Sequence, residues 1–201
     1  DPAEPENLQD LINRVKSEEA DIGLAFDGDG DRLGVISNTG QIIWPDKLMM
    51  LFSKHLLNAN PGATIISDVK CSMDLARVVQ RHQGEYLMWR TGHSHIKSKM
   101  AETGALLGGE FSGHICFRDK WYGYDDALYS AARLLDVLAN SDKSAHELFD
   151  EFPTRYCTPE IKIETTESRK FEIIDALSET LDIPNATINP IDGVRIEYEN
   201  F

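Results

Sequence analysis

Short apolar runs alternate along this chain with longer segments of helical periodicity, and this alternation limits the fold more than any other feature of the sequence. The apolar runs have strand length, whereas the longer segments repeat apolar residues every three or four positions. The predicted strands are Ile22–Phe26, Leu33–Ile36, Thr64–Val69, Glu85–Trp89, Ala105–Gly108 and His114–Phe117, and the predicted helices are Asn7–Glu19, Asp46–Asn58, Ser72–Gln83, His95–Glu102 and Asp125–Ala139. This alternation, with short Gly-bearing turns, predicts a layered α/β structure.

A domain boundary is predicted near Phe152 to Pro159, after a short helix at Ser144–Glu151. The length of 201 residues allows one domain or two small ones. After this boundary the order of predicted elements changes. We expect a strand at Ile161 and Ile163, a helix at Glu167–Glu179, and strands at Ala186–Ile188 and Val194–Tyr198. Position 1 is Asp rather than Met, and the last strand pattern has no turn after it, so we expect a piece of a longer protein.

The charge balance excludes some classes of partner. The chain has 20 Lys+Arg against 34 Asp+Glu and a formal net charge of −14, which argues against nucleic acid and anionic membrane surfaces. The longest charge-free stretches, Leu33–Pro45 and His55–Ser67, are too short to span a bilayer. The three cysteines, Cys71, Cys116 and Cys157, show no metal-type spacing, so the sequence favours a reduced, cytoplasmic compartment.

The strongest local signal is the loop 27–32, which follows a predicted strand. Asp27, Asp29 and Asp31 alternate with two glycines and are followed by Arg32. Carboxylates at alternate positions of a tight loop can converge on one hard cation, so this pattern predicts a Mg²⁺ site. Three carboxylates this close would repel one another without a cation, which makes a purely structural loop the weaker alternative.

Two other motifs share part of this pattern. A calcium EF-hand counted from Asp27 would need Gly where Arg32 stands, so that interpretation fails. A haloacid-dehalogenase-type phosphatase would use Asp27 as its nucleophile and could draw its later acidic pair from Asp125 and Asp126. The phosphatase stays open as an alternative, although it does not explain the third carboxylate.

A basic patch lies where a predicted strand ends and the next helix begins. Its members are Arg90, His93, His95, Lys97 and Lys99, and Lys70 at the end of another strand could add to it. This edge of an α/β sheet is where phosphorylated ligands bind, because free amides and the helix dipole favour an anion. Lys97 and Lys99 could equally form the solvated face of a helix.

The segment 108–114 places a carboxylate, a hydroxyl and an imidazole between glycines. Glu110, Ser112 and His114 occupy alternate positions, and on an extended segment alternate residues face the same way. All three could then hydrogen-bond neighbouring hydroxyls of a sugar. By chemistry alone this signal is weak, since Ser and His in a strand are usually structural.

Four motifs, in this order and spacing, resemble the α-D-phosphohexomutase superfamily, and within it the bacterial phosphomannomutase/phosphoglucomutase family. They are the 27–32 loop, Asp68-Val69-Lys70, Thr91-Gly92-His93-Ser94, and Gly109-Glu110-Phe111-Ser112-Gly113-His114. The resemblance implies the end of a second α/β domain at 1–40, a third α/β domain at 41–152, and the start of a smaller α+β domain at 155–201.

The resemblance also implies residue roles. Asp27, Asp29 and Asp31 would hold Mg²⁺, and Arg32, Lys70 and His93 would lie near the transferring phosphoryl group. The sugar-recognition loop would comprise Glu110, Phe111, Ser112, Gly113 and His114.

The implied activity is an isomerase that interconverts 1- and 6-phosphates of mannose and glucose through a phosphoserine and a hexose 1,6-bisphosphate. The family's Ser-His-Asn-Pro segment and its Arg-x-Ser-Asn-Thr phosphate loop are missing from this sequence. We therefore expect an inactive fragment that works with the other domains of the same polypeptide on phosphorylated hexoses. A non-catalytic metal- and sugar-binding module is a further alternative.

Overall fold

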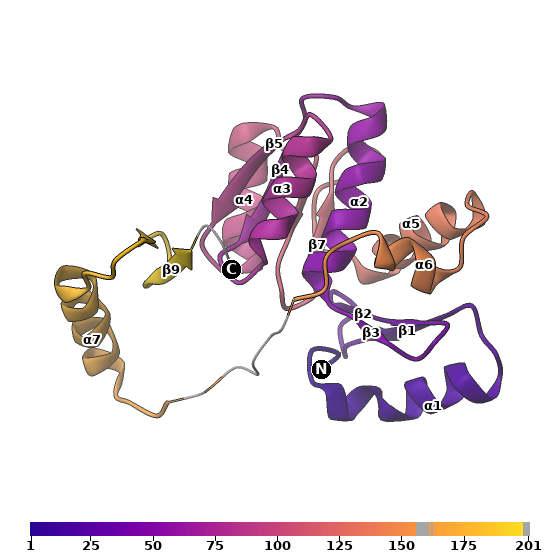
Figure 1. Cartoon of the computed structure of the whole chain (residues 1–201), viewed down its shortest axis with the longest axis horizontal. Helices are drawn as coiled ribbons and strands as arrows, with labels where there is room; N and C mark the ends of the chain where they lie inside the picture. Colours follow the sequence, from indigo (N-terminus) through magenta and orange to yellow (C-terminus); the bar gives the residue numbers. More distant parts are fainter. Residues whose placement is uncertain (156–160, 162, 199–201) are drawn as a thin grey trace. The chain divides into compact units, whose positions relative to one another are not determined.

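The structure, a computed structural model, describes residues 1–155, 161 and 163–198 (Figure 1). The chain divides into a first compact unit, Asp1–Thr154, and a second, Arg155–Phe201. The predicted boundary residue Pro159 and Cys157 lie outside the described residues, and the strand predicted at Ile161 and Ile163 lies partly outside them.

The main sheet of the first unit has the strand order β5-β4-β6-β7. Its members are β4 (Thr64–Asp68), β5 (Glu85–Trp89), β6 (Leu107–Gly109) and β7 (Ile115–Phe117). Strands β5, β4 and β6 are parallel, and β7 returns antiparallel to β6 through a tight turn. The carboxyl ends of three strands therefore meet at one edge, where their following loops come together.

Helices cover both faces of this sheet, as the alternation of side chains requires. Ile65 packs into the larger core cluster with α2 (Pro45–Ala59) and α3 (Met73–Arg81), whereas the next residue, Ile66, packs against α4 (His93–Thr103). Two further helices, α5 (Ala127–Ala139) and α6 (Ala145–Asp150), add buried residues to the larger cluster. This arrangement confirms the layered α/β architecture predicted from the sequence.

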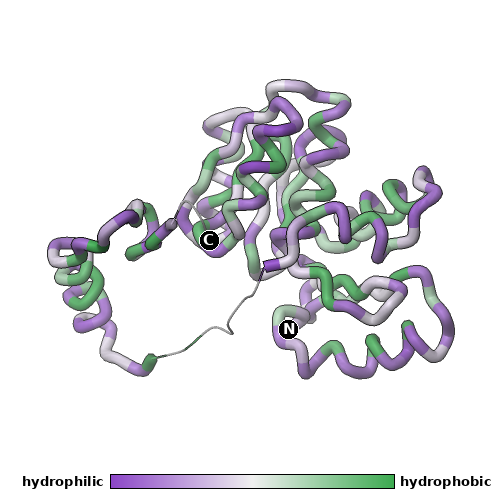
Figure 2. The backbone as a smooth tube through the Cα atoms, in the orientation of Figure 1, coloured by the Kyte–Doolittle hydropathy of each residue, from purple (hydrophilic) through white to green (hydrophobic). Residues whose placement is uncertain are grey.

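A second, antiparallel sheet precedes the main one and consists of β1 (Ile22–Phe26), β2 (Leu33–Ser37) and β3 (Ile42–Ile43). Ahead of it, the 3-10 turn η1 (Pro5–Leu8) leads into α1 (Gln9–Ser17). Hydrophobic positions recur between hydrophilic ones along α1 (Figure 2), and its Ile12 and Val15 pack on Ile36 of β2. Phe26 pairs with Leu33, so the acidic loop 27–32 is the connection of a β-hairpin.

Side-chain caps set several helix starts. Ser72 Oγ accepts the backbone N–H of Asp74 at the start of α3, and Asp126 Oδ1 accepts that of Tyr129 at the start of α5.

The second unit contains α7 (Glu167–Thr180) and a hairpin of β8 (Ala186–Asn189) and β9 (Arg195–Tyr198). In the part of the chain that the structure describes, we find no helix long and apolar enough to cross a membrane.

Candidate functional site

Asp27 closes the acidic loop between β1 and β2. Its Oδ1 accepts the backbone N–H groups of Asp31 and Arg32, each at 3.1 Å, and its Oδ2 accepts from Arg32 Nε at 2.6 Å. Gly30 has a φ of +76°, a conformation that a side chain would strain. Burial raises the pKa of Asp27, but the hydrogen bonds and charge of Arg32 outweigh burial and hold that pKa well below its usual range. The amides of the loop and the Arg32 side chain therefore hold the Asp27 carboxylate in one orientation.

The three aspartates of the loop form an acidic triad. One carboxylate oxygen from each of Asp27, Asp29 and Asp31 lies within 4.8 Å of the others. Burial raises the pKa of Asp31, and the neighbouring carboxylates raise it further, although His114 opposes them. Oxygen donors that crowd together and repel one another fit a hard divalent cation such as Mg²⁺, so the residues present suit that ion.

Glu110, Ser112 and His114 converge on one side of the turn between β6 and β7, but not for the reason predicted. The inference that they alternate along an extended segment is wrong, because Phe111 and Ser112 lie in a turn closed by Gly113 N–H donating to the Glu110 carbonyl at 3.1 Å. His114 Nδ1 lies 2.8 Å from Ser112 Oγ and 3.1 Å from Glu110 Oε2. A polar cluster results because the chain folds back, not because the strand alternates.

The acidic loop and this turn are hydrogen-bonded to each other. The Leu33 N–H donates to the Gly113 carbonyl at 3.1 Å, and Arg32 pairs with His114 in an antiparallel bridge. Gly113 has a φ of +102°, and a Cβ there would lie 3.1 Å from the Leu33 carbonyl, so the close approach depends on glycine. As a result, His114 Nε2 comes within 3.4 Å of Asp31 Oδ1, and the two loops make one site.

The start of α4 is the third segment that contributes residues to the site, after the acidic loop and the β6–β7 turn. His93, its first residue, hydrogen-bonds through Nδ1 to Asp125 Oδ2, and Lys97 Nζ donates to Asp125 Oδ1 at 2.7 Å. The rings of His93 and His114 stack with centroids 5.0 Å apart. Burial raises the pKa of Asp125, but Lys97 and His93 together lower it below its ordinary value.

The β6–β7 turn also contacts the end of β4, Trp44 and the start of α4. The Phe111 N–H donates to Asp68 Oδ1 at 3.2 Å, and Asp68 is fully buried at the end of β4. The Phe111 ring stacks on Trp44 at 5.9 Å, with an angle of 14° between the rings. The Gly92 N–H donates to Glu110 Oε1, which ties the turn to the start of α4. Burial raises the pKa of Glu110, but His114 and Gly92 lower it more, so the carboxylate is favoured.

The structure brings together most, but not all, of the residues that the sequence singled out. Its contacts join the acidic triad, Arg32, His93, Glu110, Ser112, Gly113 and His114. Lys70 is exposed in the turn after β4, and among the described residues it makes no hydrogen bond or ion pair. Sequence reasoning missed the supporting contacts of Asp68 and Asp125, and the strand-end position of Asp68 beside Lys70 was the available signal for the first.

Two family models and several known proteins match this chain. Residues 44–156 match the family model for phosphoglucomutase/phosphomannomutase, alpha/beta/alpha domain III, and residues 1–40 match the model for domain II. A phosphomannomutase/phosphoglucomutase of Pseudomonas putida is 56% identical over 200 residues, which are 100% of this chain and 43% of that protein. The chain thus spans less than half the length of this curated relative.

Two solved structures have a fold similar to that of this chain. The crystal structure of a phosphoglucomutase/phosphomannomutase family protein from Burkholderia thailandensis is 50% identical with a TM-score of 0.93, and the match covers 99% of this chain and 42% of that one. An N-acetylphosphoglucosamine mutase of Aspergillus fumigatus, solved in complex with GlcNAc-6P and magnesium, is 13% identical with a TM-score of 0.53. That match covers 65% of this chain and 35% of the other.

Proposed function

This chain belongs to the phosphoglucomutase/phosphomannomutase family, and we propose that it supplies the metal loop and the sugar-recognition turn of an isomerase acting on hexose phosphates. The reaction interconverts mannose 1-phosphate and mannose 6-phosphate, and the corresponding glucose phosphates. The observation that carries this proposal is the 3.4 Å approach of His114 Nε2 to Asp31 Oδ1, which joins the acidic triad to a polar turn able to hold a sugar.

The cofactor is Mg²⁺, held by Asp27, Asp29 and Asp31. When bound, the ion neutralises negative charge on a phosphoryl group during transfer. The all-oxygen donor set and the mutual repulsion of the three carboxylates support this choice.

Arg32, Lys70 and His93 act on the phosphoryl group. Arg32 and Lys70 contribute positive charge beside the transferring oxygens. His93 is fixed by the hydrogen bond of its Nδ1 to Asp125, which leaves Nε2 to exchange a proton with a sugar hydroxyl. Lys97 holds the other oxygen of Asp125, so the imidazole keeps one orientation.

The β6–β7 turn recognises the sugar. Glu110 and Ser112 bind adjacent hydroxyls, His114 and the backbone at Gly113 complete the turn, and Phe111 anchors it on Trp44. Mannose and glucose differ at carbon 2, so a turn that reads the other hydroxyls accepts both. A hexose 1,6-bisphosphate, the intermediate and activator, fits the same turn in two opposite orientations.

The remaining functions belong to other parts of the same polypeptide. Residues 1–40 would be the end of the second domain, 41–152 the third, and 155–201 the start of the fourth. The phosphoserine carrier has no matching segment in this sequence, so the chain by itself would show negligible turnover.

A chimera tests the proposal. The matching 43% of the Pseudomonas putida relative is replaced by this chain, and turnover of mannose 1-phosphate and glucose 1-phosphate is followed in a coupled assay with Mg²⁺ and hexose 1,6-bisphosphate. We expect turnover of both sugars that collapses in Asp29→Asn. Glu102→Gln, an acid-to-amide change on an exposed residue of α4, is the matched control and should stay active. A folded chimera without turnover would contradict the proposal.

A further inference from the structure

A second cluster of metal-type ligands lies beside the acidic triad. Asp31, His93, His114 and Asp125 each offer one ligand atom, and these four atoms lie within 4.8 Å of one another. All four residues are partly buried, and they come from four separate segments of the first unit. We propose that this cluster, here called the His/Asp cluster, is a binding site for Zn²⁺ that overlaps the acidic triad at Asp31.

The ligand chemistry favours zinc. Zn²⁺ binds imidazole nitrogen and carboxylate oxygen and prefers four tetrahedral ligands, which this cluster can supply. Bond lengths of about 2.0–2.1 Å place neighbouring tetrahedral ligands about 3.4 Å apart. His114 Nε2 and Asp31 Oδ1 already lie 3.4 Å apart, and His93 is already paired with Asp125, so only modest movement is needed to close the site.

The two sites offer different donor atoms and should therefore prefer different cations, although they share one residue. The acidic triad offers oxygen alone, which suits Mg²⁺, whereas the two imidazoles of the His/Asp cluster favour a softer transition metal. Asp31 belongs to both sets. A bound Zn²⁺ would therefore take a carboxylate from the triad and engage His93, so zinc should inhibit an enzyme built on this chain.

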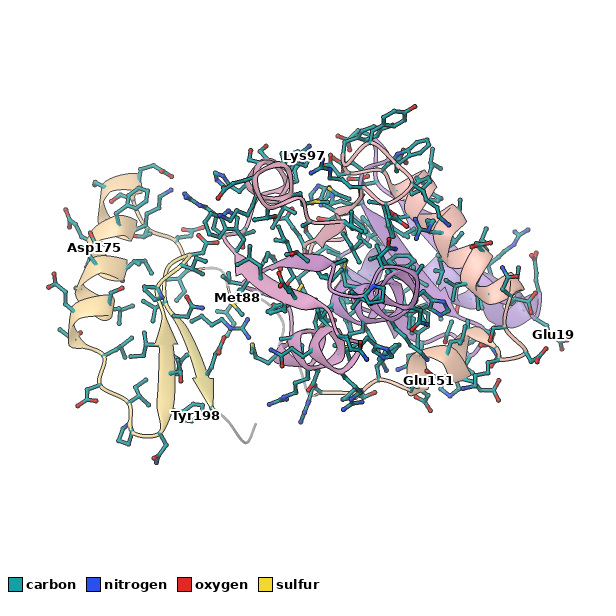
Figure 3. All side chains as sticks on the ribbon, turned by 90° about the horizontal axis from the view of Figure 1, so that it is seen from above. Glu19, Met88, Lys97, Glu151, Asp175 and Tyr198 are labelled. Carbon is teal, nitrogen blue, oxygen red and sulfur yellow. The ribbon has the colours of Figure 1, made fainter. Side chains whose placement is uncertain are left out.

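Lys97 opposes zinc at this site. Its Nζ lies 2.7 Å from Asp125 Oδ1 and 3.4 Å from His93 Nδ1, and the side chain projects from α4, where Figure 3 labels it. A positive charge this close repels a second cation. Removing the charge should strengthen zinc binding, a gain that a misfolded variant could not imitate.

Isothermal titration of this chain with ZnCl₂ tests the inference directly, and it does not rest on the proposed function because no turnover is measured. We expect zinc affinity to fall by about tenfold or more in His93→Gln and Asp125→Asn. Asp29→Asn removes a triad ligand that the His/Asp cluster does not use, so the affinity should stay unchanged. Lys97→Met should raise it.

The opposite pattern would overturn the inference. Loss of zinc binding in Asp29→Asn with no effect of His93→Gln would place the ion in the acidic triad. Absence of zinc binding by the unmodified chain, or equal affinity in all variants including Lys97→Met, would remove the site altogether.

Discussion

Asp27 and Asp29 both belong to the acidic triad, yet their substitution should affect stability differently. Asp27→Asn keeps an oxygen that can accept the backbone N–H groups of Asp31 and Arg32, but it removes the charged acceptor of Arg32 Nε. A hydrogen bond between charged groups contributes about 1.5–3 kcal/mol. Two effects reduce this contribution: the Arg32 side chain is 28% exposed, and the substitution relieves repulsion between the carboxylates. We therefore expect the free energy of unfolding to fall by about 1–2 kcal/mol.

That loss converts to a measurable shift in melting temperature. For a unit of this size, 1 kcal/mol corresponds to about 2–4 °C, so Asp27→Asn should lower the Tm by roughly 2–8 °C. Asp29 is exposed and makes no hydrogen bond among the described residues. Asp29→Asn removes only repulsion and should leave the Tm unchanged or slightly raised.

Tryptophan fluorescence during heating is the assay, with EDTA present to exclude metal. All three tryptophans, Trp44, Trp89 and Trp121, lie in the first unit, so the signal reports the unit that holds the loop. Equal destabilisation by the two substitutions, or a Tm of Asp27→Asn equal to that of the unmodified chain, would refute the structural role assigned to Asp27.

Three further predictions follow from other contacts. In the chimera, Asp125→Asn should lower kcat about tenfold or more with little change in KM, because His93 loses its orienting partner; steady-state kinetics with an unchanged kcat would contradict this. Gly108→Ala should lower the free energy of unfolding in urea by about 1–3 kcal/mol, because the added Cβ would overlap the Met100 sulfur of α4. Gly28→Ala, whose Cβ would meet open space, should lower it by less than about 0.5 kcal/mol. Burial lowers the pKa of His114, but Glu110 and Asp31 raise it more, so this pKa lies above its ordinary value of 6.5. The stability that protonated His114 contributes to the fold is therefore present below pH 6.5 and is lost as the pH rises through the pKa of the folded state. Tm measured from pH 5 to 9 should therefore show a decline that His114→Gln flattens.

Local patterns predicted the main elements well. Strands β1 (Ile22–Phe26) and β5 (Glu85–Trp89) lie where the apolar runs placed them, because each run contains its own boundary signals. Strand β3 (Ile42–Ile43) was missed, since two residues show no period. The helix α4 begins at His93, two residues before its predicted start, because Gly92 already serves as its N-terminal boundary.

The site was harder to predict than the fold. Residue types identified the acidic loop and the turn, but the turn's geometry depends on Gly113 fitting against Leu33 rather than on strand alternation. The contacts of Asp68 with Phe111 and of Asp125 with Lys97 join residues 43 and 28 positions apart. Only the packed sheet brings such pairs together, so the position of Asp68 at a strand end marked it as a candidate but could not reveal its partner.

The fate of the phosphoryl group tests the central claim most directly. ³¹P NMR of the chimera with mannose 1-phosphate, Mg²⁺ and catalytic hexose 1,6-bisphosphate would follow every phosphorus species at once. We predict that mannose 6-phosphate grows as mannose 1-phosphate falls while inorganic phosphate stays constant, and that Asp29→Asn stops the exchange. Accumulation of inorganic phosphate in place of mannose 6-phosphate would contradict the mutase and favour a phosphatase.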